Sequence, residues 1–177
     1  LVETLAQSKD AKAIATIEKL IDAPDIEVRG LVYRQLAAIK HQPFLDRLPY
    51  LYLYETAPLG RVILLTLMTP EQFDLYRDEL AGYVSARSPE ILRLVLKLIS
   101  QRQLAQSQKL VAQILKQAPN AEVIRQALPL AERDMRHAPA LVSILQSGEY
   151  AQLDKPLLKV LADYPAIPAE KCKDRST

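Results

Sequence analysis

Apolar residues recur along this chain at spacings of three and four, which is the period of an α-helix, and the same pattern returns every 32 residues. A column of arginines marks the repeat: Arg29, Arg61, Arg93 and Arg125, each 32 residues after the one before. The positions one before and two and three after each arginine are apolar, except at Gly60. Because these offsets share one side of a helix, each arginine is predicted to lie beside a buried stripe on a helix that opens near residue 25, 58, 88 or 120.

A weaker apolar column follows 19 residues after each arginine, at Leu48, Leu80, Ala112 and Ile144. It predicts a second helix in every unit, over residues 43–55, 70–85, 104–117 and 138–146. Further helices are predicted over 2–7, 11–22 and 155–163. One helix pair cannot cover its own apolar face, so neighbouring pairs must stack. The predicted fold class is therefore all-α, an α-α superhelix or solenoid of about five helix pairs.

The composition agrees with a folded helical chain rather than a disordered one, because 49% of the residues are apolar and only four are glycine. We predict one repeat domain over residues 1–165 and a polar tail over 166–177. The tail holds Cys172, the single cysteine, which leaves no disulfide framework or cysteine-rich zinc site within the chain. The first residue is Leu1 rather than methionine, so we expect a domain of a larger or processed protein from the cytoplasm or periplasm.

Charge and hydropathy restrict the class of partner. The apolar runs are far shorter than the roughly 20 residues of a membrane-spanning helix, so no span is predicted. A formal net charge of +2 supplies little long-range field, which disfavours nucleic acid as a partner. A protein or peptide partner is the remaining prediction.

The chain carries no reaction-specific motif. The only histidines are His41 and His137, and their separation fits no metal-binding spacing, so neither a metal nor a cofactor is predicted. Asp134 and His137 lie three apart in a charged segment between predicted helices, where a base and its partner could meet. Charged turns are usually only solvated, so no catalytic residue is predicted.

The sequence D-I-E-V-R at Asp25 to Arg29, followed by apolar residues at helical spacing, resembles the bacterial HEAT-like repeats named after phycobilisome lyases. The resemblance extends from about residue 10 to residue 164. It implies a ladder of acids and arginines between adjacent units, although Ala57, Pro89 and Ala121 replace the acid in three of them. It also implies a binding scaffold, the usual role of such repeats, with a few enzymes among them.

Two functions follow from this reading. The first is a non-catalytic protein- or peptide-binding scaffold whose second helices line a concave face, with Arg47, Tyr50, Tyr54, Arg77, Tyr83, Lys109 and Gln113 as its contacts. The alternative is a HEAT-like enzyme, such as an alkylpurine DNA glycosylase or a bilin lyase; the absence of tryptophan and the small net charge disfavour the glycosylase. The tyrosines could instead pack in the core or at its rim. The arginine column could bind anions or connect adjacent units, and we favour the second role for it.

Overall fold

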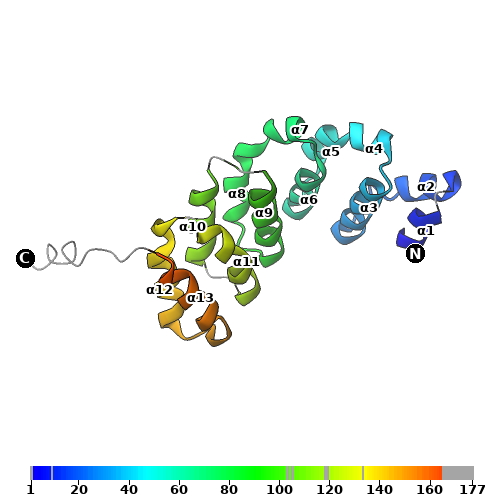
Figure 1. Ribbon diagram of the computed structural model, residues 1–177. Helices are drawn as coiled ribbons and strands as arrows, with labels where there is room; N and C mark the ends of the chain where they lie inside the picture. Colours follow the sequence, from blue (N-terminus) through cyan, green and yellow to red (C-terminus); the bar gives the residue numbers. More distant parts are fainter. Residues whose placement is uncertain are drawn as a thin grey trace, which may run out of the picture. The chain divides into compact units, whose positions relative to one another are not determined.

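The computed structural model describes residues 2–8, 10–102, 104, 106–117, 120–132 and 134–164, and every regular element among them is a helix (Figure 1). The α-helices are α1 (Val2–Ser8), α2 (Ala11–Glu18), α3 (Ile26–Ala38), α4 (Gln42–Asp46), α5 (Leu48–Tyr54), α6 (Pro58–Leu67), α7 (Pro70–Asp74), α8 (Leu80–Val84), α9 (Pro89–Arg102), α10 (Ser107–Gln117), α11 (Ala121–Ala131), α12 (Ala138–Ser147) and α13 (Asp154–Ala162). Three short 3₁₀ helices are η1 (Arg77–Glu79), η2 (Met135–His137) and η3 (Ala151–Leu153). The all-α prediction is confirmed.

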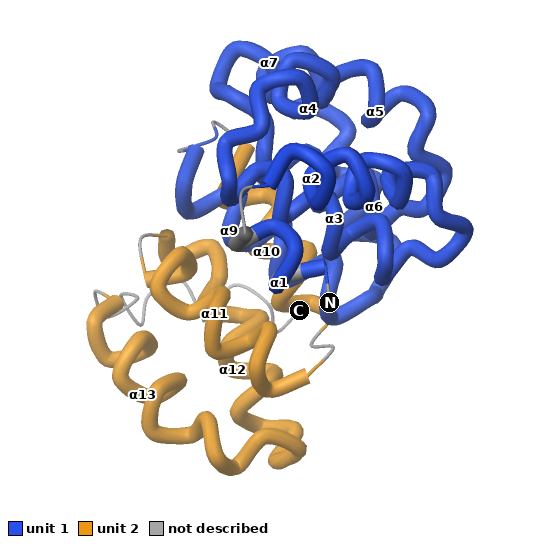
Figure 2. Tube along the Cα trace, turned by 90° about the vertical axis from the view of Figure 1, so that its right-hand side faces the viewer, with its two compact units in different colours: residues 1–104 blue, residues 105–177 orange. Residues whose placement is uncertain are grey.

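The chain forms two compact units, unit 1 over Leu1–Leu104 and unit 2 over Ala105–Thr177 (Figure 2). That residues 1–165 make up one repeat domain stays a prediction. In unit 1, α1 packs on α3, α3 on α6 and α6 on α9, so the first helices of successive pairs are neighbours in chain order. Helices α5 and α8 pack on the first helix of the following pair, α6 and α9. In unit 2, α10 packs on α11 and α12, and α13 packs on the same two helices.

The first helix of each predicted pair begins where the arginine column places it, as α3, α6, α9 and α11. Local chemistry sets these starts. The side chain of Asp25 accepts a hydrogen bond from the N–H of Glu27, and that of Asn120 accepts one from the N–H of Val123. Pro58 stands at the first position of α6, where a missing N–H is harmless.

The second helices over 43–55 and 70–85 are each divided, unlike the predicted single helices. Pro49 in the first turn of α5 has no N–H for the carbonyl of Leu45, so the helix is interrupted between α4 and α5. The side-chain amide of Gln72, in α7, donates to that carbonyl at 3.4 Å. This hydrogen bond therefore connects the second helix of one pair to the second helix of the next pair. In the 70–85 segment, η1 stands between α7 and α8, with no proline at the break.

The core of unit 1 lies around α6 and α9. Val62 to Leu65 are four consecutive residues with at most 1% of their surface exposed, so α6 is buried on all sides. Helix α9 exposes the polar stripe Glu90, Arg93, Lys97 and Gln101 and buries the apolar positions between them.

Candidate functional site

The predicted binding residues on α5 are exposed. Arg47 stands just before α5, and Tyr50 and Tyr54 follow it by three and seven residues, so the three share one side of the helix. Tyr50 is 53% exposed and Tyr54 68%, and their ring centroids are 4.4 Å apart. Leu53, which the sequence analysis did not single out, lies beside them with 60% of its surface exposed. We call Arg47, Tyr50, Leu53 and Tyr54 the tyrosine face.

Two other predicted contacts in unit 1 differ in environment. Arg77 is exposed and lies 4.0 Å from Asp74 and 3.8 Å from Asp78. Tyr83 is buried, and its hydroxyl lies 2.8 Å from that of Tyr52. The Tyr83 side chain therefore packs inside unit 1 and offers little surface to a partner.

Lys109 and Gln113, the remaining predicted contacts, are exposed on α10 of unit 2. They are four residues apart, so they share one side of that helix. They form a surface of unit 2, separate from the tyrosine face of unit 1.

The first two arginines of the repeat column converge on Glu55, the residue that ends α5. Arg29 donates from Nε and Nη2 to the two carboxylate oxygens of Glu55, at 3.0 and 2.7 Å. The Nη1 of Arg29 also donates to the carbonyls of Ala23 and Pro24. Arg61 donates from Nε to the backbone carbonyl of Glu55 at 2.6 Å. Both arginines thus join α5 to the first helices on either side of it, α3 and α6.

The other two arginines of the column are solvent-facing. Arg93 is exposed on α9, and Arg125 is exposed on α11, where it pairs with Glu122 one turn earlier at 2.8 Å. An exposed pair of this kind contributes about 0–1 kcal/mol. The repeat column therefore has two environments, half-buried in the first two units and exposed in the last two.

Glu55, the buried acid that both arginines contact, was not predicted from the sequence. It is only 5% exposed, and its carboxylate also accepts from the hydroxyl of Tyr33 at 2.9 Å and the N–H of Ala57 at 2.9 Å. Burial acts to raise the pKa of Glu55, but the bonds from Arg29, Ala57 and Tyr33 outweigh it and lower that pKa. Burial is the main cause that raises the pKa of Tyr33, and the hydrogen bond to the Glu55 carboxylate raises it further. Glu55 is therefore an ionised, fully bonded group at neutral pH.

Gly60 makes room for this carboxylate. A Cβ at position 60 would lie 2.5 Å from Cδ of Glu55 and 2.7 Å from Cδ1 of Ile26. The sequence analysis had not connected this glycine to any acid, because the two residues are related only through the packing of α5 on α6.

A cavity of about 230 Å³ opens beside this cluster in unit 1. Its lining includes Arg29, Tyr33 and Glu55 from the cluster, Tyr54 from the tyrosine face, and Asp22. Tyr54 therefore belongs both to the tyrosine face and to the lining of this cavity, which also includes the Arg29–Glu55 ion pair. Tyr52, between the two exposed tyrosines, points inward and donates from its hydroxyl to Glu79 at 2.6 Å.

The Asp134 and His137 pair does not form a catalytic arrangement. Asp134 caps η2 and pairs with Arg136, whose hydrogen bond lowers the pKa of Asp134 to about 2. His137 turns away, with Nε2 at 2.7 Å from Oε1 of Gln108 on α10. Burial lowers the pKa of His137, so the ring is neutral and bridges two helices.

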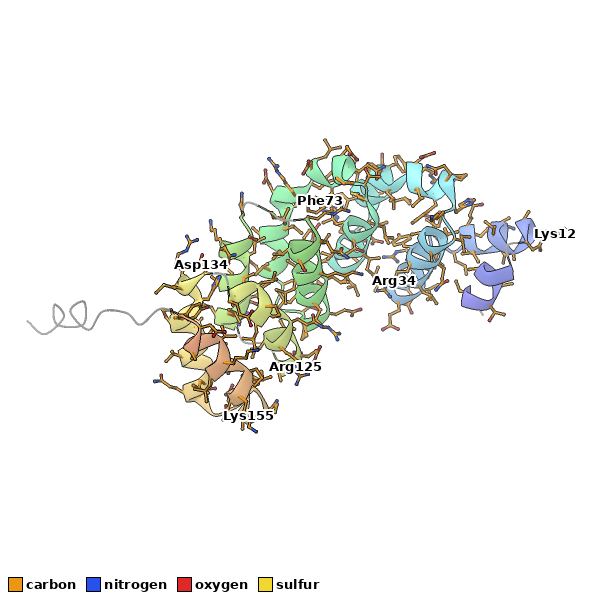
Figure 3. All side chains as sticks on the ribbon, viewed as in Figure 1. Lys12, Arg34, Phe73, Arg125, Asp134 and Lys155 are labelled. Atoms are coloured by element: carbon orange, nitrogen blue, oxygen red, sulfur yellow. The ribbon has the colours of Figure 1, made fainter. Side chains whose placement is uncertain are left out.

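Figure 3 shows how the charged side chains are spread over the surface of each unit, with Lys12 and Arg34 in unit 1 and Asp134 and Lys155 in unit 2. Over the described ranges, acidic, histidine and cysteine side chains form no group of three that could hold a metal ion. None of the helices described has the length and apolar character needed to cross a membrane.

No model of a known protein family, no curated protein and no solved structure matches this chain.

Proposed function

We propose that this chain is a HEAT-like helical array that binds a peptide or a partner domain, without catalysis, through the tyrosine face. The array is supported by the 32-residue period and by the chain-order packing of α1, α3, α6 and α9. Each added pair covers the apolar side of the one before it. The second helices then remain on one surface, where a partner can reach them.

The observation that carries the proposal is the exposure of Tyr50, Leu53 and Tyr54, each more than half accessible on a single short helix. Aromatic side chains supply a large contact area at low entropic cost, and tyrosine and arginine are enriched where binding energy concentrates. Arg47 stands on the same side of α5, and the adjoining recess contains Tyr54. The tyrosine face thus combines an apolar anchor site, a cation and a cavity.

Selection of peptides from a displayed random library tests this proposal. Peptides enriched on the unaltered protein are measured against the double variant Tyr50→Ser with Tyr54→Ser. We expect at least a tenfold loss of affinity, because truncating a binding hot spot costs 2 kcal/mol or more. The control is Leu158→Ser, which removes a similarly exposed apolar side chain from unit 2.

Retained helicity of both variants, measured by circular dichroism, shows that the fold is intact. Peptides that bind the double variant and the unaltered protein equally would exclude the tyrosine face as the binding site. A library that yields no enriched peptide would count against peptide binding altogether.

A further inference from the structure

A second surface, in unit 2, carries three cationic side chains, whereas the tyrosine face has only Arg47. A groove of about 420 Å³ runs between α11 and α13. Its rim carries Arg125 from α11 and Lys155 and Lys159 from α13, against the single carboxylate of Glu132. Both Arg125 and Lys155 lie toward the lower edge of unit 2 in Figure 3, while Asp134 lies at the opposite edge. We name the surface formed by Arg125, Glu132, Lys155 and Lys159, with the apolar residues between them, the basic groove.

The two lysines are not neutralised within the described part of the chain, where neither forms an ion pair. They are exposed and four residues apart on α13, so they face the same side of that helix. Like charges at this spacing destabilise an isolated helix by a few tenths of a kcal/mol. An anionic group placed in the groove would remove that repulsion.

The floor of the groove is apolar. Leu128 and Val160 form it from the two helices, with Pro129 and Pro156 beside them. Leu128 and Val160 are themselves almost completely buried, so the floor is fixed by packing of α11 on α13. A ligand that fits must offer an apolar side chain as well as negative charge.

A proline inside α11 alters the backbone hydrogen bonding beside the groove. Pro129 stands inside α11 and has no N–H, so the carbonyl of Arg125, four residues earlier, receives no helical hydrogen bond from it. Arg125 and Pro129 both line the groove. The lining contains no aromatic ring on which a base could stack, which disfavours a single-stranded nucleic acid.

We propose that the basic groove binds an acidic peptide segment that carries an apolar side chain between its carboxylates. The carboxylates would lie against Lys155 and Lys159, and against Arg125 in exchange for its exposed partner Glu122. The apolar side chain would lie on Pro129 and Pro156, above the packed Leu128 and Val160. This site is independent of the tyrosine face, because it lies in the other unit and uses different chemistry.

Fluorescence anisotropy with the whole chain tests the proposal. The probe is a short labelled synthetic peptide in which glutamates flank a leucine. Two reference peptides replace the glutamates by lysine or the leucine by serine, and a third reference probe is a labelled single-stranded oligonucleotide. We expect binding of the glutamate and leucine peptide that weakens as salt rises, and weaker binding of each reference.

The variant Lys155→Glu with Lys159→Glu should weaken that binding about tenfold, because charge reversal at a complementary surface places like charges opposite each other. The matched control is Lys12→Glu with Lys97→Glu, which changes the net charge equally at two exposed lysines of unit 1 that belong to neither proposed binding surface. The Tyr50→Ser with Tyr54→Ser variant should bind the probe normally, which separates this result from the function proposed for the tyrosine face.

Three outcomes would overturn the proposal. Equal losses in the two lysine double variants would mean attraction to net charge alone. Equal binding of the serine peptide would remove the apolar floor from the site. Tighter binding of the oligonucleotide, lost in the Lys155 and Lys159 variant, would assign the groove to nucleic acid.

Discussion

Glu55 shows how one residue can hold neighbouring helices together. Its carboxylate receives four hydrogen bonds, from Arg29 twice, Tyr33 and Ala57, and its carbonyl receives a fifth from Arg61. A buried charge is tolerated only when its lone pairs are satisfied in this way. The two arginines of the first repeats are thereby fixed in place by an acid that lies outside their own column.

Replacing this acid should be costly. We expect Glu55→Gln to lower the free energy of unfolding by about 3 kcal/mol, because it leaves the half-buried guanidinium of Arg29 without its counter-charge. Urea denaturation at neutral pH measures the change. The control is Glu122→Gln, which removes the exposed partner of Arg125 and should cost under about 1 kcal/mol. Similar losses in the two variants would contradict the contrast between the buried and exposed ends of the arginine column.

The stability difference between the unaltered protein and Glu55→Gln should also depend on pH. The pKa of Glu55 is lowered by folding, so its contribution is present above the unfolded value of about 4.3 and is lost as pH falls through the folded pKa. The stability difference between the unaltered protein and Glu55→Gln should therefore shrink below about pH 4. A difference that stays constant from neutral pH to pH 3 would mean that the ionised form of Glu55 contributes nothing.

Glycine substitutions test the space around the carboxylate. Gly60→Ala should destabilise the protein by about 1–3 kcal/mol, because its Cβ would meet a carboxylate that four hydrogen bonds hold in position. Gly82→Ala is the matched control. No atom lies within 4 Å of a Cβ at position 82, in α8, so alanine should stabilise that helix by about 0.5–1 kcal/mol. Thermal denaturation that shifts both variants in the same direction would contradict this assignment.

The sequence could not identify Glu55 because it does not recur. The residue 32 positions later is Arg87 and the one 32 positions earlier is Ala23, so a search by period passes over it. The arginine column, in contrast, was visible because it occupies the same helical position four times. Periodicity detects what the repeats share, and the acid that satisfies the arginines belongs to one repeat alone.

At the scale of elements, the pattern located helix starts well and helix interruptions poorly. The starts of α3, α6, α9 and α11 follow from apolar spacing and capping residues, both of which are local. The division of the 43–55 helix was not predicted, although Pro49 lacks the N–H that a continuous helix needs. The break between α7 and α8 has no such local marker.

His137 provides a test at this scale, because it connects η2 and α12 to α10 through Gln108. Its Nδ1 is buried and has no partner among the described residues, while Asp134 and Arg136 act on the ring in opposite directions. Because burial lowers the pKa of His137, the unfolded chain binds the proton first as pH falls below about 6.5. Stability should fall between about pH 7 and pH 5, and His137→Gln should reduce that slope. An unchanged slope in urea titrations of this variant would assign the pH dependence to other groups.

At the scale of the whole molecule, the 32-residue spacing continues from Arg93 to Arg125 without any change near residue 104, where one compact unit ends. A boundary there could not be predicted from the pattern. Local helix-pair contacts are the same in kind on both sides of it, with each first helix packed on its neighbours. In a chain built in this way, a destabilising substitution should weaken mainly the helices that contact it.

Native-state hydrogen exchange measures whether it does. Leu64 in α6 and Leu157 in α13 are both fully buried, and replacing either by alanine should cost about 2–5 kcal/mol. In an array whose repeats contact only their neighbours, Leu64→Ala should reduce amide protection in α3, α6 and α9 and leave α11 and α13 nearly unchanged. Leu157→Ala should do the reverse. If each variant instead lowers protection by the same amount in every helix, the chain unfolds as one cooperative body, and the repeat-array interpretation fails, because its stability would not be a sum of neighbouring terms.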